Sequence, residues 1–119
     1  MFRWKPGRVG TGYFTCRLWQ NKWLVKFDVY IVKYPEGSYI PPHTDPSPVS
    51  GKRHFRFNYT FWLPKICGGF AYQGTAEEHK HVYYRSKRIT FFRPDIIEHE
   101  VMKVVEGTRY VLSIGWLRT

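Results

Sequence analysis

The stretch HEVMKVVEGTRYVLSIGW, residues 99–116, contains two runs of β-branched and other apolar residues with a turn signal between them. That signal is Glu106-Gly107, because glycine adopts backbone conformations that other residues disfavour. Valine, isoleucine and aromatic residues on both sides of it are typical of strands. The stretch therefore predicts one strand over 98–104 and a second over 109–117 that runs back past His99.

The rest of the chain follows the same pattern, and few windows show the i, i+3, i+4 apolar spacing of a helix. Gly, Pro and Asn separate the short runs, as at Gln20-Asn21, 35–37 and 64–69. The further strands predicted are 12–19, 22–34, 39–45, 54–63, 69–74, 80–85 and 88–93. Because no helix is available to cover a sheet, we expect an all-β protein whose sheets pack on each other as a sandwich, barrel or jelly roll.

A length of 119 residues allows one domain, and no repeat or linker divides it. We expect a loose basic arm over 1–10 and a mobile loop over 46–54. The opening residues lack the apolar run of a secretion signal, and Cys16 and Cys67 form no CxxC pair, so a cytoplasmic location is expected. No apolar run approaches the ~18 residues needed to cross a bilayer, so no membrane contact is expected. The sequence does not indicate an oligomeric state.

The chain is basic, with 19 Lys and Arg against 9 Asp and Glu and a formal net charge of +10. Such an excess attracts polyanions or acidic surfaces, so nucleic acid and acidic proteins are candidate partners. An equally good reading is that the charge serves solubility. The cluster Lys52, Arg53, His54 and Arg56 could grip phosphates or an acidic peptide, or could belong to a lid loop that happens to be basic.

Residues 43–45, HTD, offer two side chains that suit a metal ion. In a strand, His43 and Asp45 would project from one face. Two histidines and one carboxylate form the ligand set of non-haem Fe(II) oxygenases, and His99 is the candidate for the second histidine. Ten positions later, Arg109 could hold one end of a dicarboxylate by a bidentate fork while the other end chelates the metal.

Two competing interpretations exist. The HTD segment could be a proline-rich polar turn, with His99 an unrelated strand histidine. A second metal site is also conceivable in EEHKH, residues 77–81, where His79 and His81 would share a face in a strand. No glutamate follows them at a spacing of three to four residues, as a cupin-type site would require, so a solvated loop is preferred there.

Three stretches together resemble a known family. KYPEGSYIPPHTD (33–45) is similar to the segment that carries its tyrosine, tight turn and HxD motif. FNYTFWLPKICGGF (57–70) resembles its third strand and Gly-Gly turn, and the stretch 99–116 resembles its distal histidine, basic residue and last strand. Over roughly residues 27 to 117 the chain thus resembles the Fe(II)/2-oxoglutarate-dependent dioxygenase superfamily, in its prolyl-hydroxylase-like branch.

The resemblance implies a double-stranded β-helix, a cupin-like jelly roll, here with an N-terminal β-hairpin extension. It implies that His43, Asp45 and His99 are the catalytic Fe(II) ligands and that 2-oxoglutarate and O2 are cosubstrates. The residues that it assigns to the 2-oxoglutarate pocket are Arg109, Tyr34, Asn58, Thr60 and Trp62. Ser113 lies two same-face steps beyond Arg109 in the strand and is expected to reach the same pocket. The implied activity is hydroxylation of a macromolecule, first a protein side chain such as proline. Alternatives are hydroxylation or demethylation of a nucleobase, or a non-catalytic basic β-barrel that binds nucleic acid.

Two details of the strands add expectations of their own. Simple apolar alternation would bury the face with Phe57, Tyr59, Phe61 and Leu63, and would leave Arg56 in solvent. Gly115 stands where the family usually has an aromatic residue, and Trp116 follows it, which predicts a bulge or a shifted strand.

Overall fold

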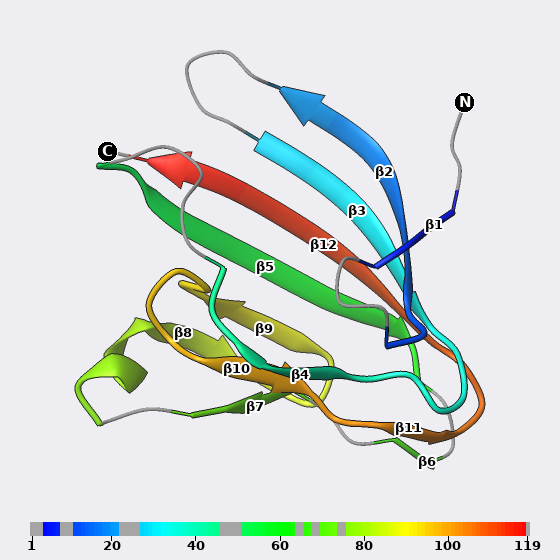
Figure 1. Ribbon diagram of the computed structural model, residues 1–119. Coiled ribbons are helices and arrows are strands. Elements are labelled where there is room, and N and C mark those ends of the chain that lie inside the picture. Colours follow the sequence, from blue (N-terminus) through cyan, green and yellow to red (C-terminus); the bar gives the residue numbers. More distant parts are fainter. Residues whose placement is uncertain are drawn as a thin grey trace.

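The computed structural model describes residues 4–7, 11–21, 27–45, 51–63, 66–67, 70–73 and 76–118. Its strands lie in two layers that open toward one side (Figure 1). The elements, in chain order, are β1 (Lys5–Pro6), β2 (Phe14–Asn21), β3 (Phe27–Tyr34), β4 (Ile40–His43), β5 (Arg53–Trp62), β6 (Ile66–Cys67), β7 (Phe70–Tyr72), the 3-10 helix η1 (Glu78–His81), β8 (Val82–Arg85), β9 (Ile89–Phe92), β10 (His99–Val101), β11 (Val104–Glu106) and β12 (Arg109–Arg118).

The larger layer is a seven-stranded sheet in the order β1-β2-β3-β12-β5-β9-β8. The last strand, β12, lies at its centre and pairs antiparallel with β3 from Arg109 opposite Tyr34 to Trp116 opposite Phe27. The smaller layer contains a sheet in the order β4-β10-β7 and the two-stranded pair β11-β6. These antiparallel layers form the predicted double-stranded β-helix, a jelly roll, with the hairpin strands β2 and β3 as its N-terminal extension.

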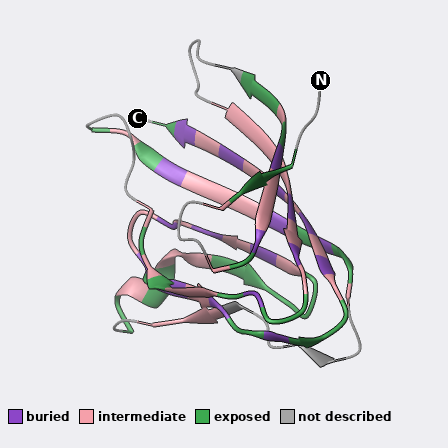
Figure 2. Ribbon diagram, turned by 45° about the vertical axis from the view of Figure 1, so that its right-hand side comes forward, coloured by how far each residue is buried: buried purple, intermediate pink, exposed green. Residues whose placement is uncertain are grey.

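Alternation along β12 explains why the two layers pack. From Arg109 to Leu117, its odd-numbered residues are buried and its even-numbered residues are only partly buried, which Figure 2 shows as alternating bands along the strand. Because successive side chains of a strand point to opposite faces, one face of the sheet must cover a core. That core joins residues of both layers: Tyr13, Val32, Tyr34, Val101, Val104 and Val111.

A glycine turn ties β3 to the smaller layer. Gly37 has φ of +84°, a left-handed conformation that other residues adopt only with strain. Its amide donates to the Val104 carbonyl at 2.8 Å, and the Val104 amide donates to the Ser38 carbonyl at 3.1 Å. The turn therefore fixes the point at which the chain leaves β3 and enters β4.

Several predicted boundaries were wrong in detail. The strand predicted over 98–104 is divided into β10 and β11, and the strand predicted over 80–85 begins only at Val82, because η1 precedes it. Residues 5–6 of the predicted loose arm pair with β2, and residues 53–54 of the predicted loop already belong to β5. The predicted strand residues 22–26 and the predicted loop residues 46–50 lie outside the described part of the chain.

Simple apolar alternation predicted the wrong inward face of β5, whereas the family resemblance placed Asn58 and Thr60 on the correct one. Asn58 and Thr60 are buried, whereas Tyr59 and Phe61 are exposed. The apolar residues of this strand therefore line the outer surface of the large sheet, and its polar residues point into the barrel. Among the described residues, no helix has the length and apolar character needed to span a bilayer.

Candidate active site

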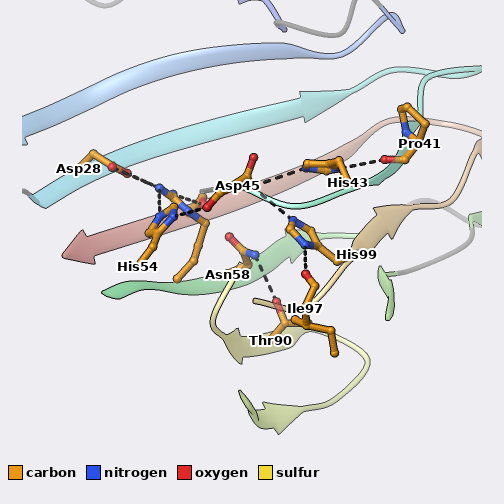
Figure 3. Close-up of polar contacts among 11 residues, drawn as sticks. Asp28, Pro41, His43, Asp45, His54, Asn58, Thr90, Ile97 and His99 are labelled. Atoms are coloured by element: carbon orange, nitrogen blue, oxygen red, sulfur yellow. Dashed lines mark hydrogen bonds and ion pairs between the residues drawn. The ribbon is translucent and has the colours of Figure 1, made fainter. Parts of the chain in front are cut away.

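The three predicted metal ligands meet on the smaller sheet. His43 ends β4 and is the direct partner of His99, the first residue of β10. Asp45 lies two residues beyond β4, and its Oδ2 is 3.5 Å from His43 Nε2 and 3.4 Å from His99 Nε2. Figure 3 shows the carboxylate facing both imidazoles. Pairing of two strands far apart in sequence has thus brought a local HxD segment to a distant histidine.

Both imidazoles are oriented by backbone carbonyls. His43 Nδ1 lies 2.8 Å from the Pro41 oxygen, and His99 Nδ1 lies 2.9 Å from the Ile97 oxygen. A carbonyl oxygen only accepts, so each Nδ1 donates, and each Nε2 is the ring nitrogen that faces Asp45 and is available to a metal ion. Metal-binding histidines are usually fixed in this way through their second nitrogen. The donor set therefore fits a divalent metal ion before any ion is bound.

Asp45 supplies the negative charge of the site. Burial acts to raise the pKa of its carboxyl, but hydrogen bonds and charge interactions with His43 and His99 hold that pKa well below its usual range. Its amide donates to the Pro94 oxygen at 2.7 Å, which anchors the segment after β4. An ionised carboxylate beside two imidazoles is the facial ligand set expected for non-haem Fe(II).

The competing site over residues 77–81 is not formed. Residues 78–81 lie in η1, where His79 and Lys80 are exposed. Within the residues that the structure describes, the ligand atoms that converge, all within 4.8 Å of one another, are those of His43, Asp45 and His99.

Arg109 is the predicted carboxylate-binding residue of the cosubstrate pocket. Its side chain is buried at the start of β12 with 2% exposure, and its Nη2 donates to Thr60 Oγ1 at 2.9 Å. Its Cζ lies 5.7 Å from the ring centre of Tyr34, the residue directly opposite on β3. A guanidinium beside two hydroxyl groups is a donor set that suits a carboxylate.

Tyr34 connects this pocket electrostatically to the metal ligands. Burial raises the pKa of its phenol well above the usual range, although the Arg109 charge acts to lower it and the Asp45 charge adds to the rise. The phenol is therefore neutral at physiological pH and can donate a hydrogen bond to an anion.

The remaining predicted pocket residues divide into two groups. Asn58 and Ser113 are buried on the inner faces of β5 and β12, where Asn58 Nδ2 donates to Thr90 Oγ1 at 3.3 Å. Trp62 is 62% exposed and does not join them. The pairing of β12 with β5 is irregular between Tyr110 and Val111, so Trp62 is paired with Tyr110 rather than with an inward-facing residue.

Sequence reasoning missed a polar group inside the barrel. Arg56, expected in solvent, donates from Nη1 to Ser113 Oγ at 2.8 Å and from Nη2 to Asp28 Oδ1 at 2.9 Å. The predicted bulge near Gly115 was wrong, because the pairing of β12 with β3 is regular there. A Cβ on Gly115 would lie 2.2 Å from Arg56 Nη2. An inward-facing glycine opposite an arginine was the signal in the sequence, since the space that the glycine leaves accommodates a large side chain.

The comparisons with known proteins agree with this geometry. The model of a family described as the 2OG-Fe(II) oxygenase superfamily matches residues 29–118. This chain belongs to the 2OG-Fe(II) oxygenase superfamily. The matched residues include every side chain of the metal site and of the predicted pocket. Fe(II) and 2-oxoglutarate, which the sequence analysis predicted, are the cofactors that this superfamily implies.

The other comparisons add no functional information on this member of the oxygenase superfamily. No curated protein matches its sequence. Among solved structures, a sugar phosphate isomerase from a cupin superfamily of Silicibacter pomeroyi is similar over 100% of this chain and 69% of its own. The identity is 16% and the TM-score is 0.47.

Proposed function

We propose that this chain is an Fe(II)- and 2-oxoglutarate-dependent dioxygenase that hydroxylates a macromolecular substrate, first of all a protein side chain such as proline. The observation that carries the proposal is the convergence of His43, Asp45 and His99, with the ligand atoms within 4.8 Å of one another. The buried Arg109 adds the group that a 2-oxoglutarate-dependent enzyme needs beside such a centre.

Each residue has a defined task in this proposal. His43 and His99 would hold Fe(II) through Nε2, because their Nδ1 atoms donate to backbone carbonyls. Asp45 would hold it through its ionised carboxylate. Arg109 and the neutral Tyr34 phenol would bind the far carboxylate of 2-oxoglutarate, and Thr60 would orient the guanidinium.

The chemistry available at such a centre is oxidation of a substrate C–H bond by O2. One oxygen atom goes to the new hydroxyl group, and the other goes to the succinate that forms as 2-oxoglutarate loses CO2. The chain itself contributes orientation, charge complementarity and exclusion of water. No side chain needs to act as nucleophile or general base.

The test is anaerobic titration of the purified protein with Fe(II) and 2-oxoglutarate, followed by admission of O2. We expect a visible metal-to-ligand charge-transfer band and succinate formation, both of which are lost in His43→Ala. In Arg109→Ala the band should require far more 2-oxoglutarate. A wild-type protein that folds and gives no band would contradict the proposal and favour a non-catalytic nucleic-acid-binding barrel.

The substrate class needs a second measurement, because the net charge of +10 also suits nucleic acid. Succinate formation is compared with proline-containing peptides, single-stranded DNA and single-stranded RNA. Stimulation by peptides supports the proposal. Stimulation by nucleic acid alone would replace it by nucleobase hydroxylation or demethylation.

A further inference from the structure

A chain of polar contacts crosses the large sheet and ends on a metal ligand. Arg56 Nη2 lies 2.9 Å from Asp28 Oδ1, 3.2 Å from Asp28 Oδ2 and 3.3 Å from His54 Nε2. His54 Nδ1 lies 3.3 Å from the main-chain oxygen of Asp45. Figure 3 shows Asp28 and His54 beside Asp45, on the side away from His43 and His99. We call Asp28, Arg56 and His54 the relay.

The direction of each hydrogen bond follows from chemistry. A guanidinium has donors and no acceptor, so His54 Nε2 must accept from Arg56. The imidazole proton then lies on Nδ1, which donates to the carbonyl of Asp45. Asp28, on the far side, accepts from Arg56 and orients the guanidinium. Each member therefore fixes the orientation of the next.

Gly115 makes this arrangement possible. It is paired with Asp28 on one side and with Arg56 on the other, so the three residues form one row across β3, β12 and β5. A Cβ at this position would lie 2.2 Å from Arg56 Nη2 and 2.5 Å from Arg56 Cζ. The guanidinium therefore passes over the backbone of β12 to reach Asp28, and any larger residue would displace it.

Asp45 needs such support because it is the ligand that lies outside the strands. His43 and His99 are the ends of two paired strands, whereas β4 stops before Asp45. The Asp45 amide is held by the Pro94 carbonyl at 2.7 Å. The bond from His54, which is itself buried, holds its carbonyl. With both sides of its backbone held, the carboxylate keeps its direction toward the two imidazoles.

We propose that the relay is a positioning device: through the carbonyl of Asp45, it holds the ligating carboxylate in the geometry that the metal requires. The inference rests on the proposed metal site. His54, Arg56 and Asp28 are positioning residues, and none of them touches the metal or the substrate in this role.

The test uses Co(II) as the probe, with affinity from a titration and geometry from the visible absorption bands of the bound ion. His54→Ala should weaken Co(II) binding about 10-fold, as is typical when the support of a ligand is lost, and should alter the bands. Gly115→Ala changes none of the relay residues but would displace the Arg56 guanidinium. It should therefore also weaken Co(II) binding and alter the bands. Glu77→Gln breaks an exposed 2.9 Å ion pair with Lys80 and is the control that should match wild type.

Two conservative variants separate positioning from packing. In His54→Asn the amide nitrogen replaces Nδ1 and can still donate to Asp45, whereas in His54→Gln the amide reaches Arg56 and leaves Asp45 without its donor. We expect His54→Asn to bind Co(II) more tightly than His54→Ala, and His54→Gln to bind no better than His54→Ala. If His54→Ala does not fold, the direct comparison decides the matter: His54→Asn should bind Co(II) more tightly than His54→Gln.

Equal affinity and equal spectra in wild type and His54→Ala would overturn the relay while leaving the proposed function intact, and so would rescue by Gln rather than by Asn. A folded wild-type protein that binds no Co(II) would overturn the proposed function, and the relay with it.

Discussion

A buried guanidinium is costly to a fold unless its charge and its donors are matched. Arg109 is such a group: it is buried at the start of β12, faces the Tyr34 ring and donates to Thr60 at 2.9 Å. The Thr60 hydroxyl fixes the direction of one arm of the guanidinium. The affinity for 2-oxoglutarate should therefore depend on Thr60, which orients the arginine.

We expect Thr60→Val, which keeps the shape of the side chain, to raise the KM for 2-oxoglutarate about 10-fold, equivalent to roughly 1.4 kcal/mol for one hydrogen bond to a charged group. The maximal rate at saturating 2-oxoglutarate should change much less. Steady-state succinate formation measures both quantities. Thr15→Val, on β2 and two strands away from β12, is the control. An unchanged KM would show that Thr60 does not orient Arg109.

The Tyr34 phenol gives a prediction on pH. Because burial raises its pKa above that of the unfolded chain, its contribution to stability is complete below about pH 10 and is lost as the pH rises further. Tyr34→Phe should therefore release as many phenolic protons as wild type up to about pH 11 in the native state, by ultraviolet absorbance. In denaturant, the variant should titrate one tyrosine fewer than the nine of wild type. A native difference at lower pH would contradict the buried position.

At the scale of elements, the turn after β3 sets the entry into the metal-binding strand β4. Gly37 has φ of +84°, and nothing lies within 4 Å of the position that its Cβ would occupy. A substitution there would be strained by the backbone alone. The turn also forms hydrogen bonds with Val104. Strain at Gly37 would therefore weaken the contact between the end of β3 and β11.

We expect Gly37→Ala to lower the free energy of unfolding by about 1 kcal/mol, the usual cost of a left-handed residue that is not glycine. Urea denaturation of the metal-free protein measures the change. Co(II) affinity should stay close to that of wild type, because the ligands are held by other contacts. A stability equal to wild type would show that the turn can relax to another conformation.

At the scale of the whole molecule, the metal site joins segments that the chain keeps far apart. Its ligands come from β4, from the segment that follows it and from β10, all in the smaller layer. An ion that binds the folded state and not the unfolded chain stabilises the fold by mass action. A bound metal ion should therefore stabilise the smaller layer by linking β4, the segment after it and β10.

Addition of Co(II) at 100 times its Kd should raise the free energy of unfolding by about 2.7 kcal/mol. For a domain of this size the corresponding rise in Tm is roughly 10 °C. Differential scanning calorimetry measures the shift, and EDTA should reverse it. His99→Ala should show no shift, whereas Glu77→Gln should behave as wild type. A wild-type Tm that does not respond to Co(II) would contradict the site.

The charge of the molecule gives a test of substrate class. With a net charge of +10, binding of nucleic acid should fall steeply with salt, by about 1,000-fold or more between 50 and 200 mM for several phosphate contacts. The KM for an uncharged proline-containing peptide should change little over the same range. Succinate assays at both salt concentrations measure this. A steep salt dependence with the active substrate would favour a nucleobase as the target.

The sequence by itself determined the strand-rich class, the HxD segment, the distant histidine and the basic residue, because turn residues, strand periodicity and ligand chemistry are local properties. The local apolar pattern of β5 did not determine which of its faces is buried. The polar face with Asn58 and Thr60 points inward and the aromatic face outward, and that choice is made by the partners of the strand across the sheet.

Only the tertiary structure decided the role of Arg56 and the place of Trp62. Arg56 is drawn inward by Asp28, 28 positions earlier, and by the space above Gly115. Trp62 stands outside the pocket because of an irregular pairing with β12. Both outcomes depend on strand register, which sets contacts between residues that no local pattern connects.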